Sequence, residues 1–219
     1  MASIASWADD YRKQNPATRQ WHGVDIPIGL NDYDPAKECV ASDQGDCIVA
    51  ELERLKRDVR CARGDQQKKA LMLAVHFVGD IHQPLHTVNE NRGGKTVDVR
   101  VIMHGASSTI QNDNLHAVWD STLIRMTVRD WRSYVSRLET GWLMSSDAQK
   151  PGIDGGQPAQ WAVETHKTAQ KIWKLTPSNK ILDDAYYVKV VPVLDQQLGL
   201  AALRLTRFLA DAFSSEECD

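Results

Sequence analysis

The chain has 219 residues, with 26 Lys or Arg against 29 Asp or Glu, so its formal net charge at neutral pH is −3. Hydrophobic residues make up 42% and charged residues 25%, which suits a globular protein large enough to bury a core and predicts a single domain over residues 1–219. The longest mostly apolar runs, residues 70–75 and 198–203, are too short to span a bilayer, and the slight negative charge argues against binding of nucleic acid by bulk positive charge.

Hydrophobic residues recur at helical spacing over most of the chain, which predicts an all-α fold. The expected helices, in chain order, cover residues 46–60, 66–82, 114–125, 129–143, 157–175 and 183–213. Pro84 should end the second helix, and Pro192 should bend or split the last one. The first residues contain neither a basic nor an apolar segment, so they do not form a signal peptide and look like the interior of a helix.

Two stretches depart from the helical pattern. Residues 93–101 place two glycines before alternating valines, which predicts a short strand and half of a small β-hairpin. Residues 145–157 are polar and contain Pro151 and three glycines, so we expect a surface loop. The sequence therefore predicts an all-α domain with a minor β element.

The cysteines allow one short disulfide. Cys39 and Cys47 flank a polar, turn-prone stretch, and closing so short a loop is sterically reasonable and would imply an oxidising compartment. Two reduced, unrelated thiols fit the spacing equally well. Cys61 and Cys218 could also pair, although no neighbouring residue favours it, and none of the cysteines has the C-x-x-C spacing of a zinc ribbon.

Histidine and aspartate recur together at two places in the predicted helices. His76 precedes Asp80 by four residues, and His116 precedes Asp120 by four, so each pair lies on one face of a helix. His86 follows the first pair closely. Imidazole and carboxylate donors in register on two helices suit a cation such as Zn²⁺, and a carboxylate can bridge two ions.

The alternative is that these histidines hold no metal. A single His/Asp pair at this spacing is most often a surface ion pair or a histidine with its hydrogen bonds satisfied. Two pairs, with Asp9, His22 and His86 as further candidates, favour metal binding instead. His76 also lies in an apolar run that should be core, where an imidazole without a partner is costly.

Three motifs occur in the order found in a known family: IASWADDYR at residues 4–12, HFVGDIHQPLH at residues 76–86 and NLHAVWD at residues 114–120. The chain resembles the zinc-dependent S1/P1 nuclease family, secreted or periplasmic enzymes that cut single-stranded nucleic acids and act as 3′-nucleotidases. The resemblance covers nearly the whole chain and implies the helical fold of the zinc phospholipase C and S1/P1 nuclease type. It also favours the Cys39–Cys47 disulfide over reduced thiols.

The resemblance implies two zinc sites within this chain. By matching position, the ligands of one are Asp9, His22, His76 and Asp80, and those of the other are His86, His116 and Asp120. In the family, the residue at the Asp80 position also reaches a third zinc, whose other ligands are an N-terminal Trp and a His shortly after it. This sequence lacks that segment, so we expect the third site to be incomplete.

The resemblance also assigns roles around these sites. Arg12 matches a basic residue near the scissile phosphate, and Asp25 matches a carboxylate beside the attacking water or the base pocket. Together with Asp80, these are the expected catalytic residues. Gly94 matches a position that lines the nucleotide cleft. Gly23 stands where relatives usually carry an aromatic residue that stacks on a base, which puts base stacking in this chain in doubt.

Other features are expected to be peripheral. Residues 104–113 form a loop that looks longer than usual for the family. His82 is expected to point outward, and His104 and His166 to lie on the surface or on a helix face.

The expected function is metal-dependent hydrolysis of phosphodiester bonds in single-stranded DNA or RNA, with 5′-phosphorylated products and 3′-nucleotidase activity. Nucleic acid or nucleotides are the expected substrates, with no protein partner and no membrane span. One alternative is a zinc phospholipase C, which typically has Glu where this chain has Asp120. Another is a degenerate two-zinc helical protein with little or no activity. The resemblance implies a secreted or periplasmic location.

Overall fold

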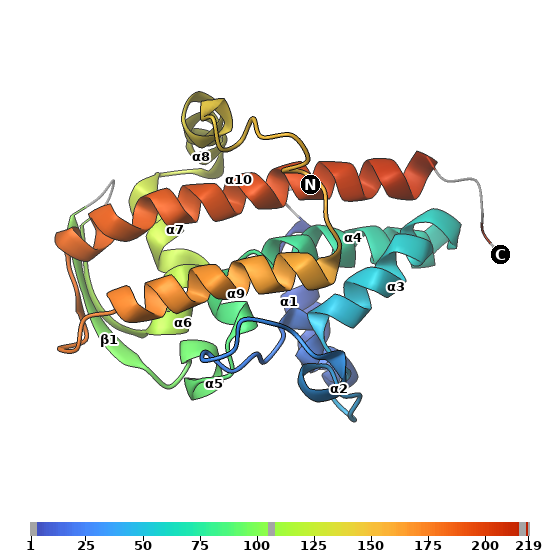
Figure 1. Cartoon of the computed structure of the whole chain (residues 1–219), viewed down its shortest axis with the longest axis horizontal. Coiled ribbons are helices and arrows are strands. Elements are labelled where there is room, and N and C mark those ends of the chain that lie inside the picture. Colours follow the sequence, from blue (N-terminus) through green and yellow to red (C-terminus); the bar gives the residue numbers. More distant parts are fainter. Residues whose placement is uncertain (1–3, 105–107, 215–217, 219) are drawn as a thin grey trace.

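The computed structural model describes residues 4–104, 108–214 and 218, and helices dominate these residues (Figure 1). The longer helices are α1 (Trp7–Gln14), α3 (Ile48–Cys61), α4 (Gly64–Asp80), α8 (Trp131–Thr140), α9 (Pro158–Leu175) and α10 (Asp184–Ser214). Shorter turns connect them: η2 (Pro16–His22), α2 (Pro35–Glu38), η3 (Pro84–Thr87), α5 (Asn91–Gly94), α6 (Leu115–Ala117), η4 (Val118–Thr122), α7 (Leu123–Thr127) and η5 (Trp142–Met144). The predicted helical class is confirmed.

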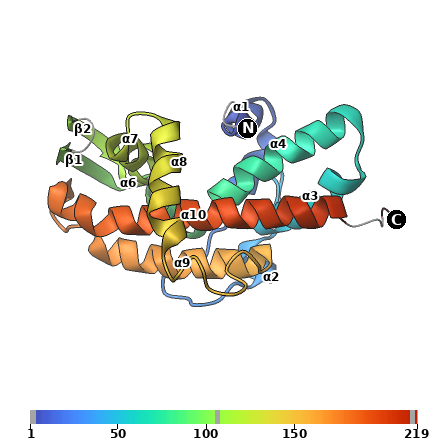
Figure 2. The same cartoon turned by 90° about the horizontal axis from the view of Figure 1, so that it is seen from above.

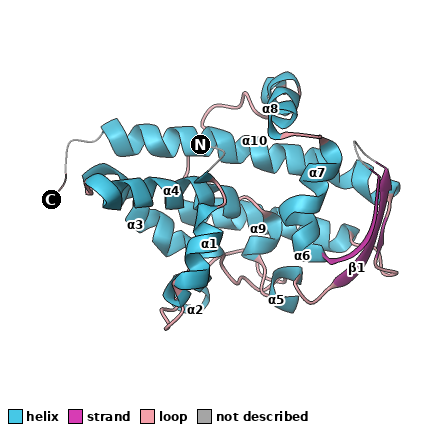
Figure 3. Ribbon diagram, turned by 180° about the vertical axis from the view of Figure 1, so that it is seen from behind, coloured by secondary structure: helices cyan, strands magenta, loops and turns pink. Residues whose placement is uncertain are grey.

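A small sheet closes one end of the molecule (Figure 3). β1 (Asp98–His104) pairs antiparallel with β2 (Ser108–Asn114) and in parallel with the short β3 (Ile181–Leu182). Alternate residues of β1 are buried, Val99 and Val101 among them, as the alternating valines predict. The predicted hairpin is therefore confirmed.

The expectation of a loop over residues 104–113 is wrong. Most of this stretch belongs to the hairpin, and only residues 105–107 lie outside the described residues. The strand was hidden in the sequence because β2 is at the edge of the sheet, so its polar side chains show no hydrophobic alternation.

The helix α10 joins two hydrophobic clusters along its length (Figure 1, red). Near its end, Phe208 and Ala212 pack in a cluster with α3 and α4, whereas near its start Tyr186, Val190 and Leu194 pack in a second cluster with the sheet. Pro192, expected to bend or split this helix, does not split it. Val190 and Leu194 on either side of the proline are buried, so packing offsets the lost backbone hydrogen bond.

Two connections fix the outer helices. Seen from above, α8 lies across α10 (Figure 2), and the Asp195 carboxylate on α10 accepts hydrogen bonds from the Tyr134 hydroxyl at 2.9 Å and the Arg137 guanidinium at 2.6 Å. His166, expected on the surface or on a helix face, lies on the inward face of α9 and is 1% exposed. Its ring nitrogens lie 2.7 Å from the Thr87 carbonyl oxygen and 3.1 Å from that of Leu30, so this side chain connects α9 to η3 and to the loop that contains Leu30.

All four cysteines are paired. Cys39 and Cys47 form the disulfide that the family resemblance favours, and Cys61 pairs with Cys218, which no local sequence feature indicated. The second bond links α3 to Cys218 across 157 positions of sequence, a separation over which spacing carries no information about proximity. Among the described residues, no helix is long and apolar enough to cross a membrane.

A polar network of His82, Arg204 and Glu164 links α10 and α9 to the residues that follow α4, and of these three side chains only Glu164, 55% exposed, reaches solvent. His82, expected to point outward, is 2% exposed, and its Nδ1 lies 2.7 Å from the Val78 carbonyl oxygen. Burial lowers the pKa of His82 to about 3, so its Nε2 is free to accept a hydrogen bond from the Arg204 guanidinium at 3.1 Å. Arg204 is also buried, donates to a Glu164 carboxylate oxygen and lies over the Trp161 ring.

Replacing Arg204 should therefore lower the free energy of unfolding. We expect Arg204→Met to lower the free energy of unfolding by about 2–3 kcal/mol, because the buried His82 nitrogen loses its donor and Glu164 loses its cation. Arg207→Met, one turn further along α10 at an exposed pair with Asp211, should change it by less than about 0.5 kcal/mol. Urea unfolding of both variants measures the difference, and equal losses would contradict a role for the network.

Candidate metal centre

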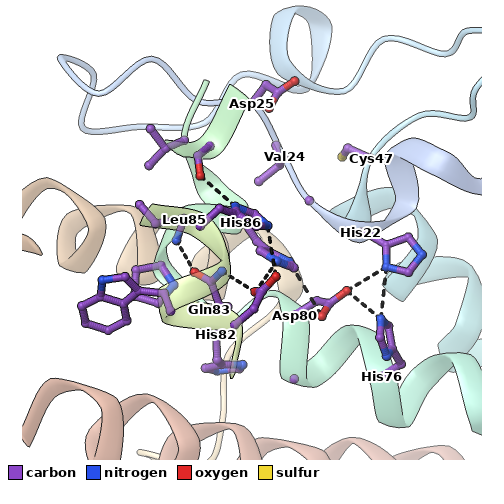
Figure 4. A pocket seen from close by; sticks show the side chains of 18 of the residues that line it. His22, Val24, Asp25, Cys47, His76, Asp80, His82, Gln83, Leu85 and His86 are labelled. Carbon is purple, nitrogen blue, oxygen red and sulfur yellow. Dashed lines mark hydrogen bonds and ion pairs between the residues drawn. The ribbon is translucent and has the colours of Figure 1, made fainter. Parts of the chain in front are cut away.

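The residues expected to bind metal converge where α4 ends. The core face of α4, with Ala74, Phe77 and Val78 fully buried, fixes the rotation of the helix so that His76 and Asp80 face a cavity. Figure 4 shows these two side chains pointing toward His22 and His86. The C-terminal end of α4 therefore forms the base of the site.

Two sets of side chains flank this helix end, each with three possible ligand atoms within 4.8 Å of one another. The His22 group consists of Asp9, His22 and His76, and the His86 group consists of His86, His116 and Asp120. The family resemblance assigns the same six residues to two sites, with Asp80 as a further ligand of the first, and the structure keeps the two sets distinct.

Asp80 lies between the two groups. One of its carboxylate oxygens is 3.0 Å from Nδ1 of His22 and 2.9 Å from Nε2 of His76. Its other oxygen is 3.7 Å from Nδ1 of His86. A single carboxylate thus faces ligand atoms of both groups, which is the arrangement that a bridging carboxylate requires.

The donors present fit a metal such as zinc. Imidazole nitrogen and carboxylate oxygen are the atoms with which Zn²⁺ is bound in sites of this composition. In addition, Nδ1 of His86 is buried and has no hydrogen-bond partner among the described residues. An unpartnered buried nitrogen is costly, and a cation beside Asp80 would satisfy it.

The electrostatics of Asp80 follow from its neighbours. Burial works against its charged form, but the charge of His86 and hydrogen bonds from His22 and His76 outweigh it and hold the pKa of Asp80 well below its usual range. Burial likewise opposes the charged form of His76, yet the hydrogen bond to Asp80 dominates and raises the pKa of His76 to about 9. Without a bound cation, the carboxylate is balanced by protonated imidazole.

In the His86 group the pKa of the carboxylate is again low, but the pKa of the His116 imidazole shifts in the opposite direction from that of His76. Burial and the charge of His86 lower the pKa of His116 to about 4. The pKa of Asp120 is held below its usual range despite burial, because His86 and His116 lie beside it and Gln83 donates to its carboxylate at 2.6 Å. Gln83 was not singled out from the sequence, although it stands inside the second motif.

Both groups open into one cavity of about 1040 Å³. Arg12 lines it and is held 2.8 Å from the Asp9 carboxylate. Lys95, which sequence reasoning missed, also lines it. Burial and the neighbouring Arg12 and Arg92 cations lower the pKa of Lys95. All three basic side chains line the cavity, so this wall is positively charged.

Two expected site residues stand apart from the imidazoles. Asp25 lines the cavity, but Figure 4 places it away from His22 and Asp80; burial raises its pKa, while the Lys95 cation opposes this. Gly94 is buried, and a Cβ there would contact the Leu85 side chain. Its neighbours in the chain line the cavity instead.

The family model for S1/P1 nucleases matches residues 1–214. The chain belongs to the S1/P1 nuclease family. Endonuclease 4 of Arabidopsis thaliana and nuclease S1 of Aspergillus oryzae are each 26% identical, the alignments covering 99% and 95% of this chain and 78% of each relative. Nuclease P1 of Penicillium citrinum is 23% identical over 99% of this chain and 86% of its own length. The protein is therefore a nuclease, a hydrolase of phosphodiester bonds.

This S1/P1 family member carries Gly23 directly after His22 for a steric reason. The Val24 N–H donates to the His86 carbonyl oxygen at 2.8 Å, which holds the two backbone segments close together. A Cβ on Gly23 would lie 2.7 Å from the same oxygen, closer than real contacts allow. A larger side chain at this position would push on the backbone of His86.

Gly23→Ala should therefore disturb the metal centre through the backbone. We expect a loss of about 1–3 kcal/mol in the free energy of unfolding, because the added methyl must displace the His86 carbonyl. Gly29→Ala is the matched control, since a Cβ there meets no atom within 4 Å, and should cost less than about 0.5 kcal/mol. Chemical denaturation of the metal-free proteins tests this, and indistinguishable midpoints would show that the backbone yields freely at Gly23.

Proposed function

We propose that the protein is a zinc-dependent nuclease that cleaves single-stranded DNA and RNA to 5′-phosphorylated products and also removes the phosphate of 3′-nucleotides. The observation that carries this proposal is the pair of His/Asp groups on either side of Asp80 in one cavity. Membership of the family supports it, as do relatives named nuclease S1 and nuclease P1.

We assign the two groups as zinc sites, with Asp80 as a ligand of the first and a bridge toward the second. Zinc bound there would polarise the phosphate oxygens and activate a water molecule for attack on phosphorus. The histidines must then be neutral at their ligand nitrogens. Asp80 favours the replacement of the imidazole proton by a metal ion, because the metal cation then balances the carboxylate charge that protonated imidazole balances in the free site.

The remaining side chains of the cavity bind and orient the substrate. Arg12, held by Asp9, is placed to neutralise a non-bridging phosphate oxygen as negative charge develops. Asp25, on the cavity wall near Lys95, is placed to accept a hydrogen bond from a base or from water. We assign Arg12, Asp25 and Asp80 the catalytic roles and Gly94 a minor role in shaping the cleft.

A preference for unpaired nucleotides follows from the shape of the site. The imidazoles of both groups are mostly buried at the cavity floor, so a phosphate reaches them only when its nucleotide can leave a base stack. The two disulfides support a secreted or periplasmic location, since such bonds persist in oxidising compartments. We further propose that the chain folds as one domain, because α10 contributes to both hydrophobic clusters.

Removal of metal should abolish activity reversibly. We expect a chelator to stop cleavage of single-stranded DNA and added Zn²⁺ to restore it. Asp80→Asn should lower kcat/KM by about a hundredfold or more even with excess Zn²⁺, because both groups lose the shared carboxylate. Asp211→Asn, at an exposed ion pair on α10, is the control and should retain activity. Full activity of Asp80→Asn, or of chelated protein, would exclude the proposed mechanism.

Substrate choice separates this proposal from the alternative of a zinc phospholipase C. A single-stranded oligonucleotide should be cut at least about tenfold faster than the same sequence in a duplex, because unstacking costs free energy only in the duplex. Phosphatidylcholine should not be hydrolysed, and the 3′ fragments should carry 5′-phosphates. Hydrolysis of phosphatidylcholine, or zinc binding near two ions per chain without any hydrolysis, would contradict the assignment.

A further inference from the structure

The segment labelled α5 is a left-handed turn rather than an α-helix. Its residues all have positive φ: 51° at Asn91, 56° at Arg92, 65° at Gly93 and 80° at Gly94. In a left-handed backbone the Cβ of an L-residue comes too close to the following carbonyl oxygen, so residues other than glycine adopt it rarely. Asn91 and Arg92 therefore hold this conformation because the surrounding structure imposes it.

Hydrogen bonds fasten both ends of the turn. The Gly94 N–H donates to the Glu90 carbonyl oxygen at 3.1 Å, and the Thr96 N–H donates to the Asn91 carbonyl oxygen at 3.2 Å. The side chain of Glu90 accepts a hydrogen bond from the Ile28 N–H, which is 2.9 Å from each carboxylate oxygen. The turn is thereby anchored to the loop that follows Asp25 as well as to its own flanks.

Gly93 has no room for a side chain. A Cβ there would lie 2.5 Å from the Leu85 carbonyl oxygen and 3.3 Å from Nδ1 of His116. At Gly94 the nearest atom to a Cβ is in the Leu85 side chain at 3.4 Å, an ordinary contact. Of these two glycines, only Gly93 is pressed against the backbone and ring that support the His86 group.

The carbonyl of Gly93 determines which ring nitrogen of His116 carries hydrogen. Its oxygen lies 2.7 Å from Nδ1 of His116 and can only accept, so Nδ1 is the donor. Nε2 then keeps its lone pair and lies 3.3 Å from the Asp120 carboxylate. The His116 ring stacks on that of His86, with centroids 4.8 Å apart and planes 7° from parallel.

We propose that Gly93 is a positioning residue for the His86 group. The left-handed turn holds the Gly93 carbonyl against His116, and this contact fixes the tautomer and ring orientation that leave Nε2 available to a metal ion. The inference rests on the proposed metal centre. The His22 group has a separate support, the Ala5 carbonyl oxygen 2.5 Å from Nδ1 of His76, so a change at Gly93 should affect one group alone.

Alanine substitutions at two glycines with positive φ test the proposal. Gly93→Ala and Gly152→Ala both lose stability through the backbone, but only at Gly93 does the added methyl meet the backbone and ring that support His116, whereas a Cβ on Gly152 meets no atom within 4 Å. Chelator competition with Zn²⁺ should show one of two ions bound about 10–100-fold more weakly in Gly93→Ala, and both within about twofold of the wild type in Gly152→Ala. The absorption spectrum of the Co²⁺-loaded protein should change only in Gly93→Ala. Equal affinities in the two variants would overturn the proposal.

A second measurement needs no variant and remains decisive if Gly93→Ala does not fold. Nitrogen-15 NMR of the histidine rings in the metal-free wild type should find His116 in the Nδ1–H tautomer. The Nε2–H tautomer would overturn the proposal. Failure of the wild type to bind Zn²⁺ would instead contradict the proposed function, so the two failures are distinguishable.

Discussion

The buried carboxylate of Asp80 is the constraint around which the site is organised. It ends α4, where the helix dipole already disfavours negative charge, and it is 15% exposed. Such a charge is tolerated only where hydrogen bonds and opposite charge compensate it, and His22, His76 and His86 supply these from three separate parts of the chain. The packing of α4, η2 and η3 is thus tied to the charge balance of one group.

The scaffold serves to hold these segments in register. α9 fastens the loops on either side of the site through His166, whose ring contacts the Thr87 and Leu30 carbonyls. The Cys39–Cys47 disulfide borders the same cavity, and the network of Arg204 and His82 backs the turn that leads from Asp80 to His86. Side chains with no direct contact to a substrate therefore limit how far the imidazoles can move.

The charge of the site is local, which reconciles a net charge of −3 with an anionic substrate. Arg12 and Lys95 line the cavity, and two metal ions would add positive charge at its floor. The position after His22 is a glycine kept small by the His86 carbonyl, so no ring can stack on a base from there. The proposed function therefore implies recognition through phosphate and metal contacts.

Local sequence patterns established the helical class and the β-hairpin, and i, i+4 spacing placed His76 with Asp80 and His116 with Asp120 on one helix face each, without help from the rest of the fold. The division of the ligand candidates into two sets came from the family resemblance, and the structure groups the same residues. Their roles as ligands remain a prediction. The burial of His82 and His166, the Cys61–Cys218 bond and the left-handed turn at Gly93 were decided only by tertiary structure. Each depends on a partner far away in the sequence, and local periodicity carries no information about such partners.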